Sequence, residues 1–204
     1  ESNADISVAA LPVALAQASN FGIIEADLSG RIIGFQEKPN QPKPLPNDPQ
    51  RAYAAMGNYL FNAELLRTAL ADAHKEGATD FGHHVLPRLS RSHRTFAYDF
   101  STNVVPDTKP YEEKSYWRDV GTLDTYFEAH LDMLGLEPRF DLFNPQWPIF
   151  SSYYQGPTSW VMQGELDNVL LGAANIIRNA KNCNWNLRRE AMVEPGAQME
   201  GAII

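Results

Sequence analysis

The stretch Trp117-Arg118-Asp119-Val120-Gly121-Thr122 decides how this chain is interpreted, together with Glu37-Lys38-Pro39 nearer its start. A glycine-bearing segment, Met56-Gly57-Asn58-Tyr59-Leu60-Phe61, lies between them. A lysine beside a glutamate can hold a sugar phosphate, and an aspartate can hold a magnesium ion. The two segments therefore contain residue types suited to a phosphorylated sugar and a divalent cation. We find no glycine-rich segment of the kind that wraps a nucleotide's phosphates at the start of a helix.

Composition narrows the class of protein. With 204 residues, 44% apolar and 21% charged, the chain can form one or two globular domains. The net charge of −8 and the absence of a lysine and arginine cluster argue against nucleic-acid binding. Cys183 is the single cysteine, which fits a reducing compartment, and no apolar run reaches the roughly 18–20 residues that span a bilayer. We expect a soluble cytoplasmic protein without a membrane partner, with a plastid location left open.

The start of the chain predicts strands. The first residue is Glu1 rather than methionine, and residues 6–11 already form a buried-type strand, so we expect a piece of a longer chain. Residues 23–35 predict a hairpin that turns at Asp27-Leu28-Ser29-Gly30. Glu37 and Lys38 then lie just past a strand end. The proline-rich residues 39–50 predict a surface loop.

Helices are expected to alternate with these strands, which predicts an α/β layer structure. A strand over residues 57–61 leads to Asn62, placed to cap a helix. A second helix over residues 81–89, kinked or ended by Pro87, precedes a strand over residues 95–100. A third helix over residues 123–134 follows the Trp117 segment. Its expected buried residues are Leu123, Phe127, Leu131 and Leu134.

Composition changes after about residue 140. Residues 141–162 carry prolines and aromatic residues but few charges, which predicts a linker over the domain surface. Within residues 163–204 a period of six relates two runs of residues: Leu171, Ile177 and Cys183, then Leu187, Val193 and Met199. Six is the period of a left-handed parallel β-helix, in which each hexapeptide forms one face of a triangular coil. With so few repeats, chance spacing is the alternative.

Glu37 and Lys38 have two interpretations. An adjacent acid and base on a loop is usually a solvated pair of little energetic consequence. Beyond a strand end, however, the two side chains can point differently. Lys38 could then meet a phosphate while Glu37 accepts hydrogen bonds from sugar hydroxyl groups. Strand ends are where ligands bind in open α/β sheets, which favours the second interpretation.

Asp119 also has two interpretations. Gly121 and Thr122 predict a turn and a helix N-cap, so Asp119 can be a simple turn residue. A carboxylate at such a switch can instead bind Mg²⁺, with waters and phosphate oxygens completing the octahedron. One carboxylate is not a complete site, so we expect a second ligand from another part of the whole protein. The five histidines match no zinc spacing, and no serine or cysteine lies in a nucleophile motif.

These segments resemble the ADP-glucose pyrophosphorylases, or glucose-1-phosphate adenylyltransferases, of glycogen and starch synthesis. Glu-Lys-Pro and Trp-x-Asp-x-Gly-Thr are shared by sugar nucleotidyltransferases generally. The Arg118-bearing version, Asp80-Phe81-Gly82 and Trp147-Pro148-Ile149 are similar to the adenylyl branch. Further matching segments are Phe21-Gly22-Ile23-Ile24, Ala55-Met56-Gly57-Asn58-Tyr59-Leu60-Phe61 and Leu86-Pro87.

The resemblance implies an α/β fold with three parts. Residues 1–140 would be the C-terminal half of a Rossmann-like nucleotidyltransferase domain, residues 141–162 a linker, and residues 163–204 the first coils of a left-handed parallel β-helix. The whole protein would be a homo- or hetero-tetramer. It would use Mg²⁺ to make ADP-glucose and pyrophosphate from ATP and glucose 1-phosphate. The family's amino-terminal ATP-loop half is absent, so we expect this chain to be inactive alone.

The resemblance also assigns residues. The glucose 1-phosphate pocket would be lined by Gly22, Glu37, Lys38, Tyr59 and Trp117. Lys38 would hold the phosphate and Asp119 would be one of two magnesium carboxylates, which makes Lys38 and Asp119 the expected catalytic residues.

Two departures leave alternatives open. The family usually has serine where Ala55 stands, and Lys-Asp where His83-His84 stands. They favour, as one alternative, a non-catalytic regulatory subunit of the same enzyme. A hexapeptide-repeat scaffold or interaction protein is the alternative from a different class.

Overall fold

The structure, a computed structural model, describes residues 3–150 and 154–204, with Asn182 described by its backbone only. It divides into two compact units, Glu1–Asn103 and Val104–Ile204. Each unit contains its own cluster of buried apolar side chains. Within the described residues, no helix is both long and apolar enough to cross a membrane.

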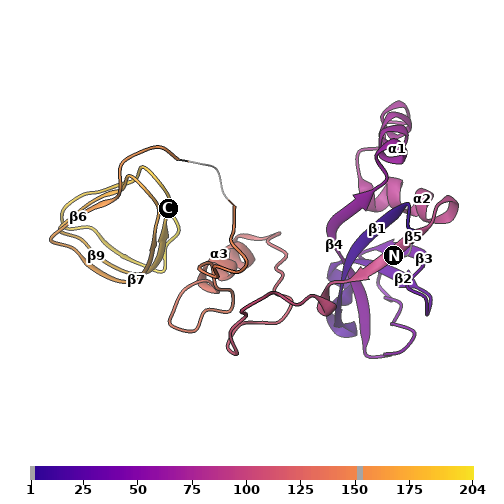
Figure 1. Cartoon of the computed structure of the whole chain (residues 1–204), viewed down its shortest axis with the longest axis horizontal. Helices are drawn as coiled ribbons and strands as arrows, with labels where there is room; N and C mark the ends of the chain where they lie inside the picture. Colours follow the sequence, from indigo (N-terminus) through magenta and orange to yellow (C-terminus); the bar gives the residue numbers. More distant parts are fainter. Residues whose placement is uncertain (1–2, 151–153) are drawn as a thin grey trace. The chain divides into compact units, whose positions relative to one another are not determined.

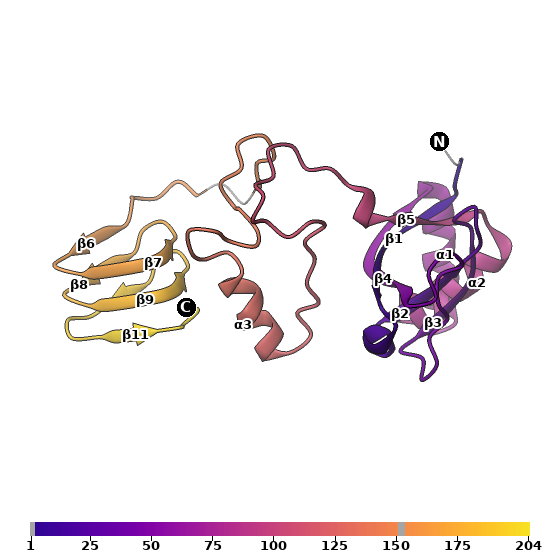
Figure 2. The same cartoon turned by 90° about the horizontal axis from the view of Figure 1, so that it is seen from below.

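The first unit is built on a mixed five-stranded sheet in the order β3-β2-β4-β1-β5. Its strands are β1 (Ile6–Ala14), β2 (Gly22–Ala26), β3 (Ile32–Glu37), β4 (Arg51–Phe61) and β5 (Thr95–Asp99). β5 runs parallel to β1, and the other neighbouring strands are antiparallel. Figures 1 and 2 show β1 and β4 inside this sheet.

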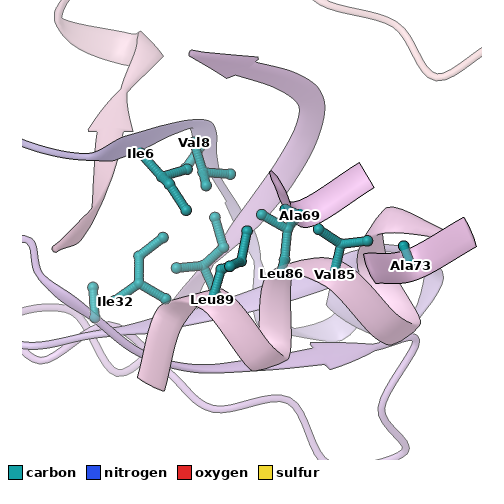
Figure 3. Packing of buried hydrophobic residues seen from close by; sticks show 11 residues of the cluster. Ile6, Val8, Ile32, Ala69, Ala73, Val85, Leu86 and Leu89 are labelled. Atoms are coloured by element: carbon teal, nitrogen blue, oxygen red, sulfur yellow. The ribbon is translucent and has the colours of Figure 1, made fainter. Parts of the chain in front are cut away.

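Three helical segments pack on the sheet: α1 (Ala63–Lys75), η2 (Phe81–Val85), which is a turn of π-helix, and α2 (Leu86–Ser92). Alternate β1 residues, Ile6 and Val8 among them, are buried, because successive strand side chains point to opposite faces. Figure 3 shows these two side chains in one cluster with Leu86 and Leu89 of α2. A smaller cluster contains Ala18 of the short 3₁₀ helix η1 (Leu15–Asn20).

The hairpin and the first helix confirm the sequence prediction. β2 and β3 pair with Gly22 opposite Glu37, and Gly30 in the turn has a φ of +82°. The Asn62 side chain accepts hydrogen bonds from the backbone N–H groups of Glu64 and Leu65, which caps α1. β4 begins at Arg51, well before the predicted start at residue 57.

Two predictions about helices were wrong. The second helix does not end at Pro87, since Pro87 lies in the first turn of α2, where no N–H donor is needed. The third helix, α3 (Leu123–Leu131), is shorter than residues 123–134, and Leu123 is 87% exposed. Leu123 is the first residue of α3 and lies in an exposed stretch. The buried residue of α3 is Ala129 instead.

The second unit ends in a coil of parallel strands. The strands are β6 (Trp160–Met162), β7 (Glu165–Leu171), β8 (Ile176–Arg178), β9 (Lys181–Leu187), β10 (Met192–Val193) and β11 (Gln198–Glu200). They form two parallel sheets, β10-β8-β6 and β11-β9-β7. Figure 2 shows the second of these sheets from the side, and Figure 1 shows the superposed coils end on.

The coil turns at residues in the left-handed φ region, which recur every five or six positions. They are Gln163, Asn168, Ala174, Asn179, Asn184, Glu190, Gly196 and Gly201. The Asn168 side chain donates to the Asn184 side chain at 2.7 Å, so these two corners are joined. Successive strand partners Trp160, Ile176 and Met192 lie sixteen positions apart.

The predicted period of six is only partly right. Ile177, Leu187 and Val193 are buried as predicted, but Leu171 is 37% exposed. Three hexapeptides would need about eighteen residues per coil. Because some corners here are five residues apart, the inward positions shift along the sequence. Trp185, which lies outside the period, is fully buried as a result.

Leu86→Ala tests the core of the first unit. Leu86 is 2% exposed, so its truncation should lower the free energy of unfolding by about 2–5 kcal/mol through lost burial and a cavity. Leu70→Ala on α1 is the control, because Leu70 is 43% exposed and should cost about 1 kcal/mol or less. Urea unfolding of the full-length protein, followed by circular dichroism, measures both. Equal destabilisation would contradict this packing.

Candidate functional site

The candidate site of the first unit lies at the open end of the β2–β3 hairpin. Gly22 begins β2, Glu37 ends β3, and the two residues are paired. A Cβ atom built on Gly22 would lie 2.8 Å from Glu37 Oε2 and 2.8 Å from Phe35 Cζ. Any larger residue at position 22 would therefore displace the Glu37 carboxylate or the Phe35 ring. Gly22 has a steric reason to be glycine.

A second glycine approaches the same carboxylate from η2. A Cβ atom on Gly82 would lie 3.0 Å from Glu37 Oε2. Asp80 is the N-cap of the π-helical turn that carries Gly82, and its Oδ1 accepts from the backbone N–H of His83 at 2.7 Å. Turns of π-helix are rare, and those that do occur are often found at functional sites. The Glu37 carboxylate thus lies beside two glycines that belong to separate elements.

Tyr59 of β4 forms an aromatic wall beside these acids. Its ring stacks on Phe81 with centroids 5.8 Å apart and planes at 12°. Burial raises the pKa of the Tyr59 phenol, and the negative charges of Glu37 and Asp80 raise the same pKa further. The phenol therefore stays protonated at neutral pH and lies within electrostatic reach of both carboxylates.

Lys38 follows directly and leaves the sheet. Its φ is +46°, an uncommon value for a residue with a side chain, and its backbone N–H donates to Phe21 O at 3.0 Å. Backbone strain of this kind gathers at ligand sites, where the surrounding structure maintains it. The Lys38 side chain is exposed and makes no hydrogen bond or ion pair with any residue that the structure describes.

Trp117 and Asp119 lie in the second unit, in the irregular segment before α3. Thr122 caps α3 through a capping box, since Thr125 N donates to Thr122 Oγ1 at 3.2 Å and Thr122 N donates to Thr125 Oγ1 at 3.1 Å. The predicted cap is therefore confirmed. The Asp119 carboxylate lies over Gly121, where a Cβ atom would be 3.5 Å from Asp119 Oδ1.

Asp119 meets the chemical requirement for a magnesium ligand. It is exposed, offers only oxygen, and forms no hydrogen bond or ion pair among the described residues. Mg²⁺ is usually bound by one or two carboxylates together with substrate phosphates and waters. Within residues 3–150 and 154–204, no group of three or more histidine, cysteine or acidic side chains is arranged to hold a metal. The second protein ligand therefore stays a prediction.

The structure adds residues to which the sequence analysis assigned no role at a site. Asp80 and Gly82 adjoin Glu37 and Tyr59, and their only signal was the Asp-Phe-Gly segment of the resemblance. Arg118 forms ion pairs with Glu113 and Asp132, partners that no sequence spacing indicated. The Glu113 carboxylate raises the pKa of Arg118, and Arg118 lowers the pKa of Glu113.

The predicted pocket residues thus fall into two groups. Gly22, Glu37 and Tyr59 come together in the first unit, and Lys38 adjoins them. Trp117 and Asp119 belong to the second unit. That both groups contact one ligand stays a prediction.

Comparison with known proteins is consistent with this geometry. Residues 1–135 match the family model described as nucleotidyl transferase, which includes both groups of candidate residues. The chain belongs to the nucleotidyl transferase family. This membership confirms the α/β nucleotidyltransferase fold that the sequence predicted for the N-terminal part.

Two similar relatives carry the same name. The chain is 45% identical over 205 residues to the glucose-1-phosphate adenylyltransferase of Thermodesulfovibrio yellowstonii, which covers 100% of this chain and 50% of that protein. The enzyme of the same name from Thermus thermophilus is 44% identical over 186 residues, covering 87% of this chain and 44% of the relative. The chain spans about half the length of the relatives it matches. The resemblance to this group is confirmed.

Glu37→Gln tests whether Tyr59 lies beside the carboxylate. Removing the negative charge should move the pKa of Tyr59 down toward 10.0, the value of an unperturbed tyrosine, because this charge helps to raise it. Titration by NMR with tyrosine labelled at Cζ, assigned with Tyr59→Phe, measures the shift in the full-length protein. Glu25→Gln is the matched control. An unchanged Tyr59 titration in Glu37→Gln would contradict the arrangement.

Proposed function

We propose that this chain is the sugar-phosphate-binding part of a glucose-1-phosphate adenylyltransferase. The reaction would join ATP and glucose 1-phosphate to give ADP-glucose and pyrophosphate. The observation that carries the proposal is the Glu37 carboxylate beside Gly22 and Gly82, followed directly by Lys38, whose side chain has no ion pair among the residues that the structure describes. The names of the relatives support the choice of substrates.

Each residue has a role that follows from its chemistry. The carboxylates of Glu37 and Asp80 would accept hydrogen bonds from sugar hydroxyl groups, because ionised carboxylates only accept. The aromatic pair Tyr59 and Phe81 would form an apolar wall for the sugar ring. The ammonium group of Lys38 would bind the phosphate as a point charge.

The reaction itself would be an in-line displacement. A phosphate oxygen of glucose 1-phosphate forms a bond to the α-phosphorus of ATP, while the bond from that phosphorus to the bridging oxygen breaks and pyrophosphate leaves. Lys38 would offset the charge of the attacking phosphate, and Trp117 would lie beside the sugar. Asp119 would hold Mg²⁺, which when bound supplies charge neutralisation on the phosphates. Positioning and electrostatics then carry catalysis, as in other phosphoryl transfers.

We also propose that the sheet of the first unit continues in the whole protein. Beyond Ala54, β4 pairs with β1 on one side and, among the described residues, with no strand on the other. Unpaired strand edges attract further strands. Leu60 on this stretch is 76% exposed, which an additional element would reduce. Such an element would belong to the ATP-binding half.

For the whole protein we retain the remaining sequence predictions as proposals. The coil of residues 163–204 would be a left-handed parallel β-helix, supported by the parallel strand pairs and the recurring left-handed corners. Residues 1–140 would form the catalytic part and residues 141–162 the linker. The protein would act as a Mg²⁺-dependent tetramer in the cytoplasm, in glycogen synthesis.

A non-catalytic regulatory subunit is the second candidate. Ala55 and His83-His84 stand where active relatives were expected to have serine and Lys-Asp, and these differences favour it. Purified full-length protein that binds glucose 1-phosphate in calorimetry but forms no ADP-glucose would select this candidate. Turnover would exclude it.

Lys38→Ala should raise the KM for glucose 1-phosphate by about 10–100-fold and leave the KM for ATP nearly unchanged. The reason is the loss of one charge-assisted contact, worth about 1.5–3 kcal/mol. Steady-state assays of the full-length enzyme measure both constants. Lys43→Ala, an exposed lysine of the neighbouring loop, serves as the control. An unchanged KM for glucose 1-phosphate in Lys38→Ala would reject the phosphate role.

Asp119→Asn should lower kcat by about 100-fold or more and raise the Mg²⁺ concentration needed for half-maximal activity, because a neutral amide is a poorer ligand for a hard cation. Asp124→Asn, at an exposed acid in the first turn of α3, is the control for the change in charge. Mg²⁺ titrations of both variants measure the effect. Equal Mg²⁺ dependence of the two variants would reject Asp119 as a ligand.

A further inference from the structure

The segment that carries Asp119 has no regular structure of its own. Residues 104–122 form neither helix nor strand, yet a metal ligand must be held in a narrow range of positions. On its C-terminal side the segment is fixed by the Thr122 capping box. On its N-terminal side Asp119 follows Arg118, whose side chain is the centre of a network of ion pairs.

The Arg118 guanidinium is held by two carboxylates. NH1 donates to Glu113 Oε1 at 2.8 Å, NH2 donates to Glu113 Oε2 at 2.5 Å, and Nε donates to Asp132 Oδ2 at 2.8 Å. NH1 also donates to the backbone oxygen of Trp117 at 3.0 Å. Four N–H···O bonds thus restrain the planar fork, a geometry that lysine cannot reproduce. The Arg118 and Asp132 side chains are only 25% and 12% exposed, which reduces screening by water.

A pair of stacked aromatic rings also contacts the Arg118 guanidinium. The Arg118 guanidinium lies 4.4 Å from the centroid of the Tyr116 ring, which stacks on Phe140 with centroids 4.9 Å apart. The Tyr116 hydroxyl donates to Asp132 Oδ2 at 3.3 Å. Cation–π and stacking contacts therefore hold the guanidinium in addition to the two carboxylates.

The network is anchored to the end of α3. Asp132 is the C-cap residue of this helix, and its backbone oxygen accepts from Arg139 N at 2.8 Å. Arg139 Nε lies 3.6 Å from Asp132 Oδ1 and adds a second positive charge. Two arginines and two acids balance, so the network has no excess charge to offer a ligand. The network is therefore suited to holding the chain in place rather than to binding a charged ligand.

We propose that Glu113 and Asp132 are positioning residues, which hold Arg118 and thereby fix where its chain neighbours Trp117 and Asp119 present their side chains. This inference rests on the proposed adenylyl transfer. Only Asp119, Val120 and Gly121 separate Arg118 from Thr122, the N-cap residue of α3. With both ends fixed, the Asp119 carboxylate has a limited range. Releasing Arg118 widens that range, and a displacement of about 1 Å can cost about 100-fold in rate.

Glu113→Gln and Asp132→Asn in the full-length enzyme test this proposal. Both should lower kcat by about 10–100-fold and raise the Mg²⁺ concentration for half-maximal activity, with the KM for ATP little changed. Asp132→Glu should restore part of the loss because it retains the charge. Glu64→Gln breaks an exposed pair with Arg67 in the first unit and should change nothing.

Two further measurements distinguish positioning from mere folding. Combining Glu113→Gln with Asp119→Asn should add little to the loss caused by Asp119→Asn, because residues that act together are not additive. A purely structural network would instead lower the melting temperature and the active fraction, leave the Mg²⁺ dependence unchanged, and give additive losses. Those results would overturn the proposal. Glu113, 40% exposed, is the milder site should Asp132→Asn fail to fold.

If the wild-type protein catalyses no adenylyl transfer, the proposed function is rejected independently of the positioning proposal. Mn²⁺ binding, measured by electron paramagnetic resonance, then tests the network without turnover. With positioning, Glu113→Gln weakens Mn²⁺ binding relative to wild type and Glu64→Gln does not. Equal binding in all three proteins would overturn the proposal.

Discussion

The register of the β2–β3 hairpin fixes the candidate sugar-phosphate site. Gly22 is paired with Glu37, and the bond from Lys38 N to Phe21 O at 3.0 Å continues the pairing past the strand end. Because side chains alternate across a strand, a slip of one residue would move Glu37 to the opposite face. The lysine and the glutamate have separate roles because β3 ends at Glu37 and the backbone of Lys38 turns to a positive φ.

Arg118 differs from Lys38 and Asp119 in whether its charge is paired with other side chains. Arg118 is surrounded by Glu113, Asp132 and an aromatic ring, and its charge is used inside the protein. Lys38 and Asp119 have no such partners among the described residues. Paired charges are suited to structure, whereas unpaired charges on constrained backbone are suited to binding a charged ligand. This contrast supports the proposed roles independently of the names of relatives.

Local signals predicted elements beside both groups of candidate residues. The turn at Gly30, the Asn62 cap and the Thr122 cap follow from residue chemistry that acts within a few positions. The burial of Leu123 was predicted wrongly, because helical spacing alone does not indicate how far a neighbouring surface extends. The inward positions of the coil were shifted from the predicted period of six because successive corners are five or six residues apart. This spacing depends on the backbone conformation at each corner. The Arg118 network could not be predicted, since its partners meet only after the segment folds around α3.

A crystal structure of the full-length protein with glucose 1-phosphate and Mn²⁺ in place of Mg²⁺ tests the central claim most directly, with the metal located by its anomalous scattering. The account predicts the ammonium group of Lys38 on the sugar phosphate, Glu37 on the sugar hydroxyl groups, and the Asp119 carboxylate on a metal ion beside the same phosphate. A structure in which Lys38 and Asp119 face unrelated surfaces, or in which the ligand binds elsewhere, would contradict it.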